Sequence, residues 1–488
     1  MEPPGRYEGV FPWQMMGDET MGSYIIRNSV LRKLFANRVI PEYVQDVLDR
    51  LDNEGYDAFI VGGCVRDLFL GRSPKDWDVA TNAKPEAVTK AFERTVPTGV
   101  EHGTVTVLVK QQAIEVTTYR VEGEYTDHRR PDSVDFTADI HQDLARRDLT
   151  INAMALNKQG ALIDFFDGLS DIKKKLLRAV GDPLERFEED ALRMLRVVRF
   201  AAELGFSIDT RTFKAAEELA PLIERISWER IRDELTKALM SPRPSYAAEL
   251  MRETGLLKYI IPELIEGVGC DQNKHHKYTV WEHNLIALEN AQPNLGLRLA
   301  ALLHDVAKPR CLTEVDGERH FFDHEHEGAR MARVILKRLR YPKSVVDRVT
   351  HLIRYHMALH YDPSMKDSAI RRLISRVGLS HMPDLLELRR VDRLASGMKK
   401  GPVSKGTLKL LNRIDRVIAA DAAFSVKDLA VDGNDVMEIA GIAPSPEVGK
   451  ILSWLLEEVL EDPNLNTRPC LEGMITEYME QGPDSHSK

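Results

Sequence analysis

The sequence predicts an α+β protein in which a strand-rich N-terminal part is followed by a long helical run. Short β-prone stretches lie between residues 58 and 119. From Pro183 onward, apolar residues recur with a helical period, and prolines and the Gly401-Pro402 junction divide the run into segments. The 488 residues exceed what one hydrophobic core usually serves, so we expect several domains.

The expected elements follow one another in a simple order. Residues 1–38 show little periodicity and are interpreted as an N-terminal extension, and residues 41–55 then have the pattern of an amphipathic helix. A polar segment from residue 122 to residue 143 contains Pro131 and predicts a long loop. The β-prone stretches between that helix and that loop are residues 58–61, 77–80, 104–109 and 113–119.

Composition argues against several classes of protein. Hydrophobic residues make up 43% and charged residues 29%, as in soluble globular proteins, and no apolar run of about 18 residues is present that would span a bilayer. We find no secretory signal pattern either. The four cysteines are widely spaced, which favours a reducing cytoplasm. The net charge of −9 leaves nucleic acid open as a partner, because phosphate affinity depends on local patches.

The segment Glu189-Asp190-Ala191-Leu192-Arg193 suits the recognition of a nucleobase. On a helix, Asp190 and Arg193 share one face. The carboxylate accepts from an exocyclic amine while the guanidinium donates to the neighbouring ring nitrogen, a pattern that cytosine and adenine present and that guanine and uracil reverse. The pair therefore predicts selection of C and A without a template. A surface ion pair is the alternative, and the preceding motifs favour base recognition.

A strand, two glycines and a helix predict a phosphate-binding turn at Gly62 and Gly63. Glycines allow backbone N–H groups to approach a phosphate closely, and Arg66 on the first helical turn can reach the same phosphates. Asp76 and Asp78 follow, two residues apart, so on a strand their carboxylates project to the same side.

Adjacent carboxylates repel each other unless a cation neutralises them, and Mg²⁺ held by carboxylates and substrate phosphates is the simplest solution. Two such ions would activate an attacking hydroxyl and stabilise a leaving pyrophosphate. Glu115, on a later β-prone stretch, is the candidate third carboxylate. The catalytic candidates are therefore Asp76, Asp78 and Glu115.

A third cluster offers donors and acceptors for a ribose and its phosphates. It consists of Arg146, Arg147, Asp148 and Asn152. A hydrogen bond to the 2′-hydroxyl would select ribonucleotides. A charged helix cap is the plainer interpretation of Asp148 taken alone.

Taken in order, these motifs resemble those of class II tRNA nucleotidyltransferases, the family of CCA-adding enzymes and bacterial poly(A) polymerases. The resemblance covers roughly residues 40 to 475. It implies a polymerase-β-like head, with a mixed sheet and helices, followed by an all-α neck, body, HD domain and tail. The implied divisions are 1–38 extension, 39–180 head, 181–272 neck, 273–400 HD domain and 401–488 tail.

The resemblance also implies an activity and its site. The 3′-hydroxyl of tRNA attacks the α-phosphate of CTP or ATP, and pyrophosphate leaves. Asp76 and Asp78 match the family's Mg²⁺ ligands. The nucleotide-contacting positions, from this match and from the clusters above, are Gly62, Gly63, Arg66, Arg146, Arg147, Asp148, Asn152, Asp190, Arg193, Arg196 and Arg199.

Several alternatives within the family stay open. Residues 98–105 resemble a segment of CCA-adding enzymes, and residues 122–143 resemble the loop that accompanies the switch from C to A addition. An enzyme that adds only A or only CC, or a poly(A) polymerase, remains an alternative. In the tail, Ser445 stands where the family usually has glycine.

A second constellation lies further along the chain in the order H…HD…D. Its members are His283, His304, Asp305 and Asp392, with His324 and His356 as candidates for a further metal. Imidazole and carboxylate groups can together bind a divalent metal. The pattern resembles HD-superfamily phosphohydrolases, so a phosphohydrolase acting on RNA ends or nucleotides is the alternative of another class. No membrane partner is expected, and no oligomeric state follows from the sequence.

Overall fold

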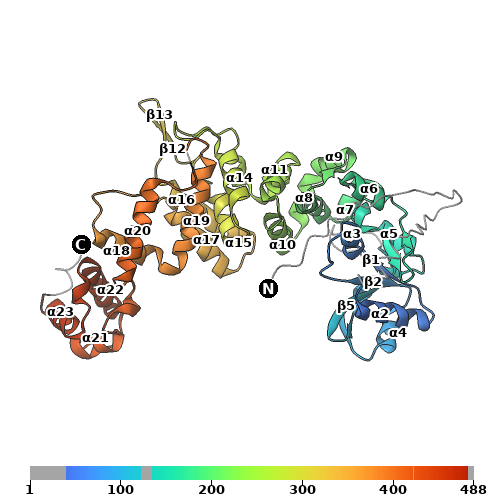
Figure 1. Ribbon diagram of the computed structural model, residues 1–488, viewed down its shortest axis with the longest axis horizontal. Coiled ribbons are helices and arrows are strands. Elements are labelled where there is room, and N and C mark those ends of the chain that lie inside the picture. Colours follow the sequence, from blue (N-terminus) through green and yellow to red (C-terminus); the bar gives the residue numbers. More distant parts are fainter. Residues whose placement is uncertain (1–39, 123–133, 400, 421–422, 482–488) are drawn as a thin grey trace. The chain divides into compact units, whose positions relative to one another are not determined.

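The computed structural model describes residues 40–122, 134–399, 401–420 and 423–481 (Figure 1). The expected extension over residues 1–38 lies outside the described residues. Internal contacts divide the chain into two compact units, with the boundary between Ile260 and Ile261. The two units are described separately below, and the five-part division stays a prediction.

The first unit contains a seven-stranded mixed sheet in the order β3-β4-β5-β2-β1-β8-β9. β2 and β5 run parallel, whereas the other neighbouring pairs are antiparallel. The β-branched residues of these stretches suit a pleated sheet covered by helices. The strands are β1 Ala58–Val61, β2 Asp78–Thr81, β3 Thr95–Gly99, β4 Thr104–Val109, β5 Gln112–Thr118, β8 Ala155–Asn157 and β9 Leu162–Ile163.

The helices of this unit fall into two groups along the chain. Those beside the sheet are α2 Glu42–Asn53, α3 Gly63–Phe69, α4 Pro85–Ala91, α5 Ile140–Ala145 and α6 Gly168–Lys174. The later ones are α7 Pro183–Glu189, α8 Leu192–Leu204, α9 Thr210–Leu219, α10 Trp228–Leu239, α11 Pro244–Glu253 and α12 Leu256–Ile260. α8 packs against both α10 and α11, so it forms the centre of the second group.

The expected loop over residues 122–143 is shorter than predicted. β6 Arg120–Glu122 pairs with β7 Val134–Phe136, and α5 begins at Ile140, where the Asp139 carboxylate accepts from the backbone N–H of His141. The polar composition of residues 122–143 predicted a loop throughout. Pairing of β6 with β7 and the Asp139 cap of α5 nevertheless form regular structure within that range. Residues 123–133 lie outside the described part of the chain.

The second unit is helical apart from one hairpin, which the helical periodicity did not predict. Strands β12 Leu312–Val315 and β13 Glu318–Phe321 pair through Asp316 and Gly317, both of which have positive φ as a two-residue hairpin turn requires. Its principal helices are α13 Pro262–Ile265, α14 Val280–Asn290, α15 Leu295–Leu303, α16 His324–Arg338, α17 Lys343–Tyr355, α18 Asp367–Val377, α19 Met382–Ala395 and α20 Lys405–Ala419. A pair of two-residue strands, β10 Leu176–Leu177 and β11 Ser207–Ile208, is a similar exception in the first unit.

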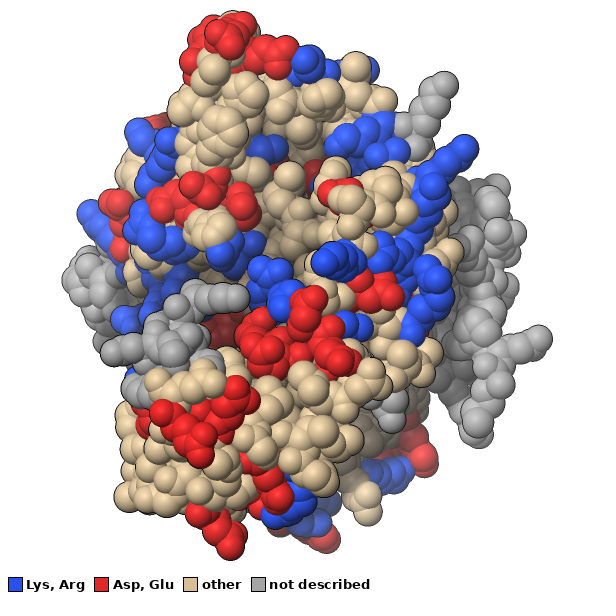
Figure 2. Space-filling view, turned by 90° about the vertical axis from the view of Figure 1, so that its left-hand side faces the viewer, with Lys and Arg blue, Asp and Glu red and all other residues tan. Residues whose placement is uncertain are grey.

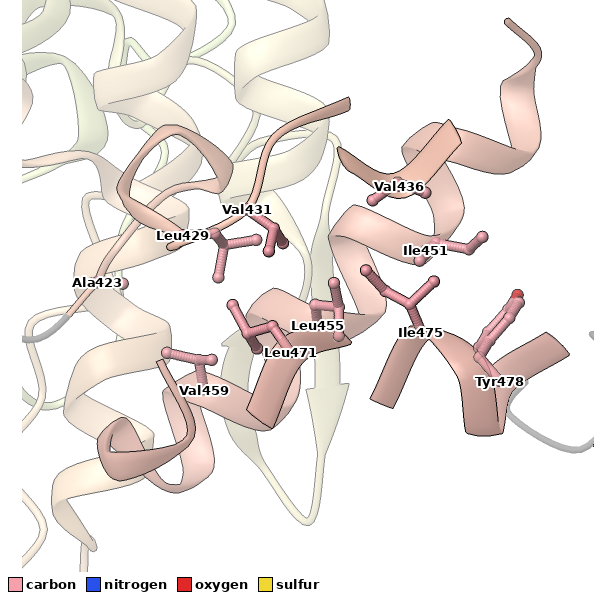
Figure 3. Close-up of a cluster of buried hydrophobic side chains, with 10 residues drawn as sticks. All are labelled: Ala423, Leu429, Val431, Val436, Ile451, Leu455, Val459, Leu471, Ile475 and Tyr478. Carbon is pink, nitrogen blue, oxygen red and sulfur yellow. The ribbon is translucent and has the colours of Figure 1, made fainter. Parts of the chain in front are cut away.

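The C-terminal helices share a small apolar core of their own. Side chains from α21 Gly433–Ala440, α22 Pro446–Glu461 and α23 Arg468–Gln481 converge there, among them Ile451, Leu455 and Ile475 (Figure 3). Ser445 precedes α22 with φ −156° and ψ 164°, an extended conformation open to any residue. Serine therefore replaces the family's glycine here without backbone strain. Within the described residues, no helix is long and apolar enough to cross a membrane.

Candidate functional site

A polar cavity of about 500 Å³ opens in the first unit, beside β1, β2, β5, α3 and α8. It brings together residues that are far apart in the sequence. Every head residue predicted from the sequence lines it except Asp76: these are Gly62, Gly63, Arg66, Asp78, Glu115, Arg146, Arg147, Asp148, Asn152, Asp190, Arg193, Arg196 and Arg199.

Gly62 makes the tight turn between β1 and α3. Its φ of 78° lies in the left-handed region, which favours glycine. A Cβ at this position would lie 3.0 Å from Arg147 Nη1 and 3.8 Å from Asp78 Oδ2. The backbone therefore approaches both a cation and a carboxylate of the cavity, as a nucleotide-binding turn requires.

Asp78 and Glu115 form the carboxylate side of the cavity. They are directly paired across the parallel strands β2 and β5, so both side chains leave the sheet on the same face. The pKa of Asp78 is raised to about 6, first by burial and then by the negative charges of Glu115 and Asp76, while Arg147 opposes them. A divalent cation would relieve this burial and repulsion, so the donor set fits a metal site.

Asp76 departs from the expectation. The strand begins at Asp78 rather than at Trp77, and Asp76 lies in the exposed turn before it, outside the cavity lining. Trp77, which separates the two aspartates in the sequence, is buried. The prediction that both aspartates project from one strand is therefore wrong, although Asp76 still acts on Asp78 through its charge.

Asp143 orients the two arginines of the third motif, and the sequence did not single it out. This fully buried carboxylate bonds Arg146 Nη2 at 2.7 Å and Arg147 Nη2 at 3.1 Å. Burial raises the pKa of Asp143, but the two guanidinium groups outweigh burial and lower it. Its spacing of three and four residues from the arginines was the available signal.

Asp148 and Asn152 belong to a buried chain of polar contacts. Arg66 Nη1 donates to Asn152 Oδ1 at 2.9 Å, and Asn152 Nδ2 donates to Asp148 Oδ1 at 3.1 Å. Arg196 Nη2 lies 2.7 Å from Asp148 Oδ2. Burial raises the pKa of Asp148, yet Arg196 and Asn152 together hold it well below its usual value. Motifs from α3, α8 and the segment between them are thereby locked into one arrangement.

Asp190 and Arg193 both reach the cavity, but they do not share a helix. Asp190 has φ −142° and ψ 101° and lies between α7 and α8, so the predicted common helical face is wrong. Asp190 instead precedes α8 and its Oδ1 accepts from the backbone N–H of Leu192 at 3.1 Å, because aspartate is favoured before a first helical turn. Arg193 Nη2 donates to the carbonyl of Arg146 at 3.0 Å.

Helix α10 supplies two further residues that sequence reasoning missed. Arg230 Nη2 lies 2.7 Å from Asp190 Oδ2, and the buried Glu234 lies 2.9 Å from Arg199 Nε. Arg230 and Glu234 are one turn apart and so face the same neighbour, α8. Arg196 and Arg199 were expected to contact the nucleotide. Both line the cavity, but Arg199 is buried and both are held by ion pairs.

A single aromatic ring supports three of the cavity's arginines. The guanidinium carbons of Arg66, Arg196 and Arg199 lie 4.9, 5.5 and 3.9 Å from the centroid of Phe200. Stacking of this kind stabilises the planar guanidinium and fixes its direction. Phe200 also lines the cavity, so its apolar ring holds the three guanidinium groups in place beside the space that a ligand would occupy.

The second constellation is a compact buried cluster around Asp305. His283 Nε2 and His304 Nε2 lie 3.4 and 3.3 Å from Asp305 Oδ2, while His324 Nε2 and His356 Nε2 lie 3.5 and 3.7 Å from Asp305 Oδ1. His304 and Asp305 come directly after α15, which ends at Leu303. The carboxylate therefore stands between two histidine pairs, one on each oxygen.

The remaining member of the pattern, Asp392 on α19, joins the first of these pairs. Its Oδ1 lies 3.3 Å from His283 Nε2. His276, which the sequence pattern did not include, has a ligand atom within 4.8 Å of ligand atoms on both residues. Lys308 Nζ lies 2.6 Å from Asp305 Oδ2 and 2.7 Å from Gln272 Oε1.

The charges of this cluster are organised by its own members. Burial raises the pKa of Asp305, but His304 and Lys308 outweigh burial, so the pKa lies well below its ordinary value. Burial lowers the pKa of His356 to about 3, which leaves a neutral imidazole at neutral pH. Burial lowers the pKa of His304 as well, but Asp305 and Asp392 outweigh burial and raise it. A neutral imidazole such as that of His356, beside an ionised carboxylate, has the protonation state that metal binding requires.

A mixed sheet that sets paired carboxylates beside a glycine turn and an arginine-lined cavity defines a nucleotidyltransferase. Three family profiles match the chain in the same order as its parts. They are the poly A polymerase head domain over residues 58–178, the probable RNA and SrmB-binding site of polymerase A over 205–267, and the putative tRNA nucleotidyltransferase domain 2 over 323–475.

Curated proteins named CCA-adding enzyme resemble this chain over most of its length. The one from Limosilactobacillus reuteri is 34% identical over 448 residues, which cover 90% of this chain and 98% of the relative. The one from Lactococcus lactis is 35% identical over 448 residues, covering 88% and 96%. The chain belongs to the family of CCA-adding enzymes.

Solved structures agree with this assignment. The crystal structure of the Bacillus stearothermophilus CCA-adding enzyme in complex with CTP matches with a TM-score of 0.68 at 29% identity, covering 90% of this chain and 98% of that one. A Thermotoga maritima CCA-adding enzyme complexed with tRNA shares the fold, with a TM-score of 0.54 at 20% identity, 92% of this chain and 98% of that one being covered. The predicted fold class and family are therefore confirmed.

Proposed function

We propose that this protein adds C, C and A to the 3′ end of tRNA from CTP and ATP. The tRNA 3′-hydroxyl oxygen forms a bond to the α-phosphorus, the bond from that phosphorus to the bridging oxygen breaks, and pyrophosphate leaves. The observation that carries the proposal is the cavity that joins Asp78 and Glu115 to Asp190 and Arg193 in one space. One wall carries carboxylates for the reacting phosphate, and the other carries the pair that selects the base.

The residues of the cavity have separate parts in this reaction. Asp78 and Glu115 would hold Mg²⁺ from the cavity wall, and Asp76 would complete the ligand set from the turn before β2. Bound there, the ion would lower the charge repulsion between the phosphate and the attacking oxygen. Gly62, Gly63 and Arg66 receive the phosphates. The tRNA hydroxyl attacks the phosphorus directly and no protein side chain forms a covalent bond to it. Catalysis therefore rests on positioning and charge stabilisation. The sugar and phosphate contacts fall to Arg146, Arg147, Asp148, Asn152, Arg196 and Arg199.

Base selection follows from hydrogen-bond polarity. Asp190 accepts from the exocyclic amine of cytosine or adenine, and Arg193 donates to the adjacent ring nitrogen. Uracil and guanine place an acceptor where these bases carry the amine, so they leave Asp190 opposite another acceptor. An unpaired polar group in such a site costs about 1 to 3 kcal/mol, enough to reject them.

The proposed RNA partner requires a basic surface despite the net charge of −9. Figure 2 shows basic and acidic side chains gathered in alternating groups, so local positive patches exist on this face. On α20, the spacing of Lys405, Lys409, Arg413 and Arg416 places four cations along one helical side. Such a row suits contact with an RNA backbone, and action on tRNA suits the cytoplasm.

Nucleotide addition to shortened tRNA tests the proposal. Radiolabelled CTP and ATP are offered separately and together to tRNA that lacks CCA, CA or A, and the products are sized. We expect two C and one A on the first substrate and none with Asp78→Asn. Products from only one of the three tRNAs would replace full CCA addition by the A-adding or CC-adding alternative.

The cluster around Asp305 favours a second candidate function, metal-dependent hydrolysis of a phosphate ester. Carboxylate and neutral imidazole ligands at this spacing fit one or two divalent metals, and metals of this kind generate a nucleophile from bound water. Lys308 adds a buried positive charge beside the cluster. The test uses His304→Ala, which should abolish hydrolysis of p-nitrophenyl phosphate or a 2′,3′-cyclic nucleotide and leave nucleotide addition unchanged. Hydrolysis that persists in this variant would assign it to another site.

A further inference from the structure

Arg230 holds the base-selecting carboxylate from a helix 40 residues away in the sequence. The Arg230 Nη2 atom lies 2.7 Å from Asp190 Oδ2, and the arginine side chain is 29% exposed. Arg230 does not line the cavity, whereas Asp190 does. Any effect of Arg230 on a bound nucleotide must therefore pass through Asp190.

Asp190 depends on this contact because its own backbone gives it little support. It lies in an extended conformation between α7 and α8. Only two contacts fix the carboxylate in the described structure: the Leu192 N–H on Oδ1, at 3.1 Å, and Arg230 on Oδ2. A carboxylate oxygen accepts more than one hydrogen bond, so each oxygen can still accept from a base.

Arg193 is anchored differently, by three groups that lie outside α10. Its Nη1 donates to the carbonyl of Arg186 at 3.1 Å and pairs with Glu189, and its Nη2 donates to the carbonyl of Arg146. The donor half of the base-reading pair thus has a fixed place without α10. Of the two halves, the acceptor Asp190 is the one whose side chain is held by α10.

The order of acceptor and donor decides selectivity only if neither partner moves. Uracil offers a ring N–H beside its carbonyl, so an Asp190 carboxylate that swings by one position along the base edge would accept from that N–H. Arg193 would then donate to the neighbouring carbonyl, and uracil would satisfy both residues. A held carboxylate excludes this second register.

We propose that Arg230 is a specificity-determining positioning residue, which restrains Asp190 so that the pair accepts cytosine and rejects uracil. This inference rests on the proposed function. It assigns to α10 a role in nucleotide choice beyond that of packing against α8.

The experiment compares Arg230→Met, Arg230→Lys and the wild type, with Arg232→Ala as the matched control. Arg232 lies on the same helix and pairs with its neighbour Asp233. Its substitution therefore removes an arginine from α10 while the contact between Arg230 and Asp190 is kept. Incorporation from CTP and from UTP is measured on tRNA lacking CCA, giving kcat and KM for each. Thermal unfolding and CTP binding in the absence of tRNA check that each variant is folded.

We expect the CTP-to-UTP selectivity to fall about tenfold or more in Arg230→Met, with KM for CTP raised more than kcat is lowered. Arg230→Lys should restore part of the selectivity, and Arg232→Ala should retain all of it. A uniform loss for both nucleotides at unchanged selectivity would overturn the inference and leave Arg230 as a structural tether. If Arg230→Met does not fold, Arg230→Gln replaces it as the variant without the charge, and wild-type selectivity for CTP over UTP in Arg230→Gln would overturn the inference equally.

Failure of the proposed function gives a different result. A wild type that binds CTP without extending tRNA would contradict CCA addition, while the ratio of CTP to UTP binding in the Arg230 variants would still test the role of Arg230.

Discussion

Asp78 and Glu115 stand directly opposite each other in the parallel pairing of β2 and β5. Two carboxylates in this relation repel each other, and part of that cost appears as the raised pKa of Asp78, about 6. The protein without metal therefore keeps a destabilising arrangement at the place where the proposed chemistry needs a cation. Four predictions follow from this and from related contacts.

Replacing Asp78 by Asn should stabilise the metal-free protein while abolishing nucleotide addition. The pKa of Asp78 is 3.8 in the unfolded chain and about 6 in the native protein. Its ionisation therefore does not destabilise the wild type below pH 3.8. The destabilisation grows as the pH rises from 3.8 to about 6 and is complete above that pH. We expect a gain of about 1 kcal/mol at pH 8 after discounting for solvent. Thermal unfolding in EDTA at pH 8 and pH 4 measures it; an equal gain at both values would contradict the charge argument.

Replacing Asp148 by Asn should destabilise the first unit most at neutral pH. The native pKa of Asp148 lies below its usual 3.8, so its contribution is present above that value and is lost as pH falls through the native pKa. Loss of the ion pair to Arg196 should cost about 2 kcal/mol, because Arg196 would keep a charge without its nearest partner. Urea unfolding at pH 7 and pH 3 should show the difference shrinking in acid, and a pH-independent difference would point to packing instead.

Replacing Gly62 by Ala should impair nucleotide addition by more than backbone strain alone explains. The new Cβ would lie 3.0 Å from Arg147 Nη1, and φ is positive. Gly71→Ala is the matched control, because Gly71 also has a positive φ but no atom within 4 Å of an added Cβ. Both variants should lose about 1 kcal/mol of stability, and only Gly62→Ala should lose activity. Equal losses of activity would refute a role for the close approach to Arg147.

Metal content should separate the two sides of Asp305. His356→Ala removes an imidazole beside Asp305 Oδ1, whereas His283→Ala removes an imidazole beside Asp305 Oδ2. If the cluster holds two divalent ions, each variant should lose about one ion by elemental analysis, and Asp305→Asn should lose both. If the single substitution His356→Ala already removes all the metal, the cluster holds one ion that both sides of Asp305 share. Asp323, Glu325 and His326 form an exposed group that serves as a control for adventitious binding.

The motifs supplied most of the residues that line the cavity, but not Thr104, Arg120, Phe200 or Glu203. Asp78, Arg147 and Asp190 carry charged groups that suit metal, phosphate and base, and that chemistry does not depend on knowing the fold. The strand and helix patterns predicted an α+β head and a helical remainder, while the mixed sheet was implied by the family resemblance. Asp76 was misplaced because strand periodicity does not say where pairing begins, and Trp77 is buried where the predicted strand would have started.

Composition and spacing were enough to predict most of the charged side chains that line the cavity, because hydrogen-bonding polarity and charge are properties of the residues themselves. The partners that orient them needed the folded chain. Arg230 reaches Asp190 across 40 residues, and Glu234 reaches Arg199 across the packing of α10 on α8. Contacts between distant segments follow from how helices pack, and no local pattern records that geometry.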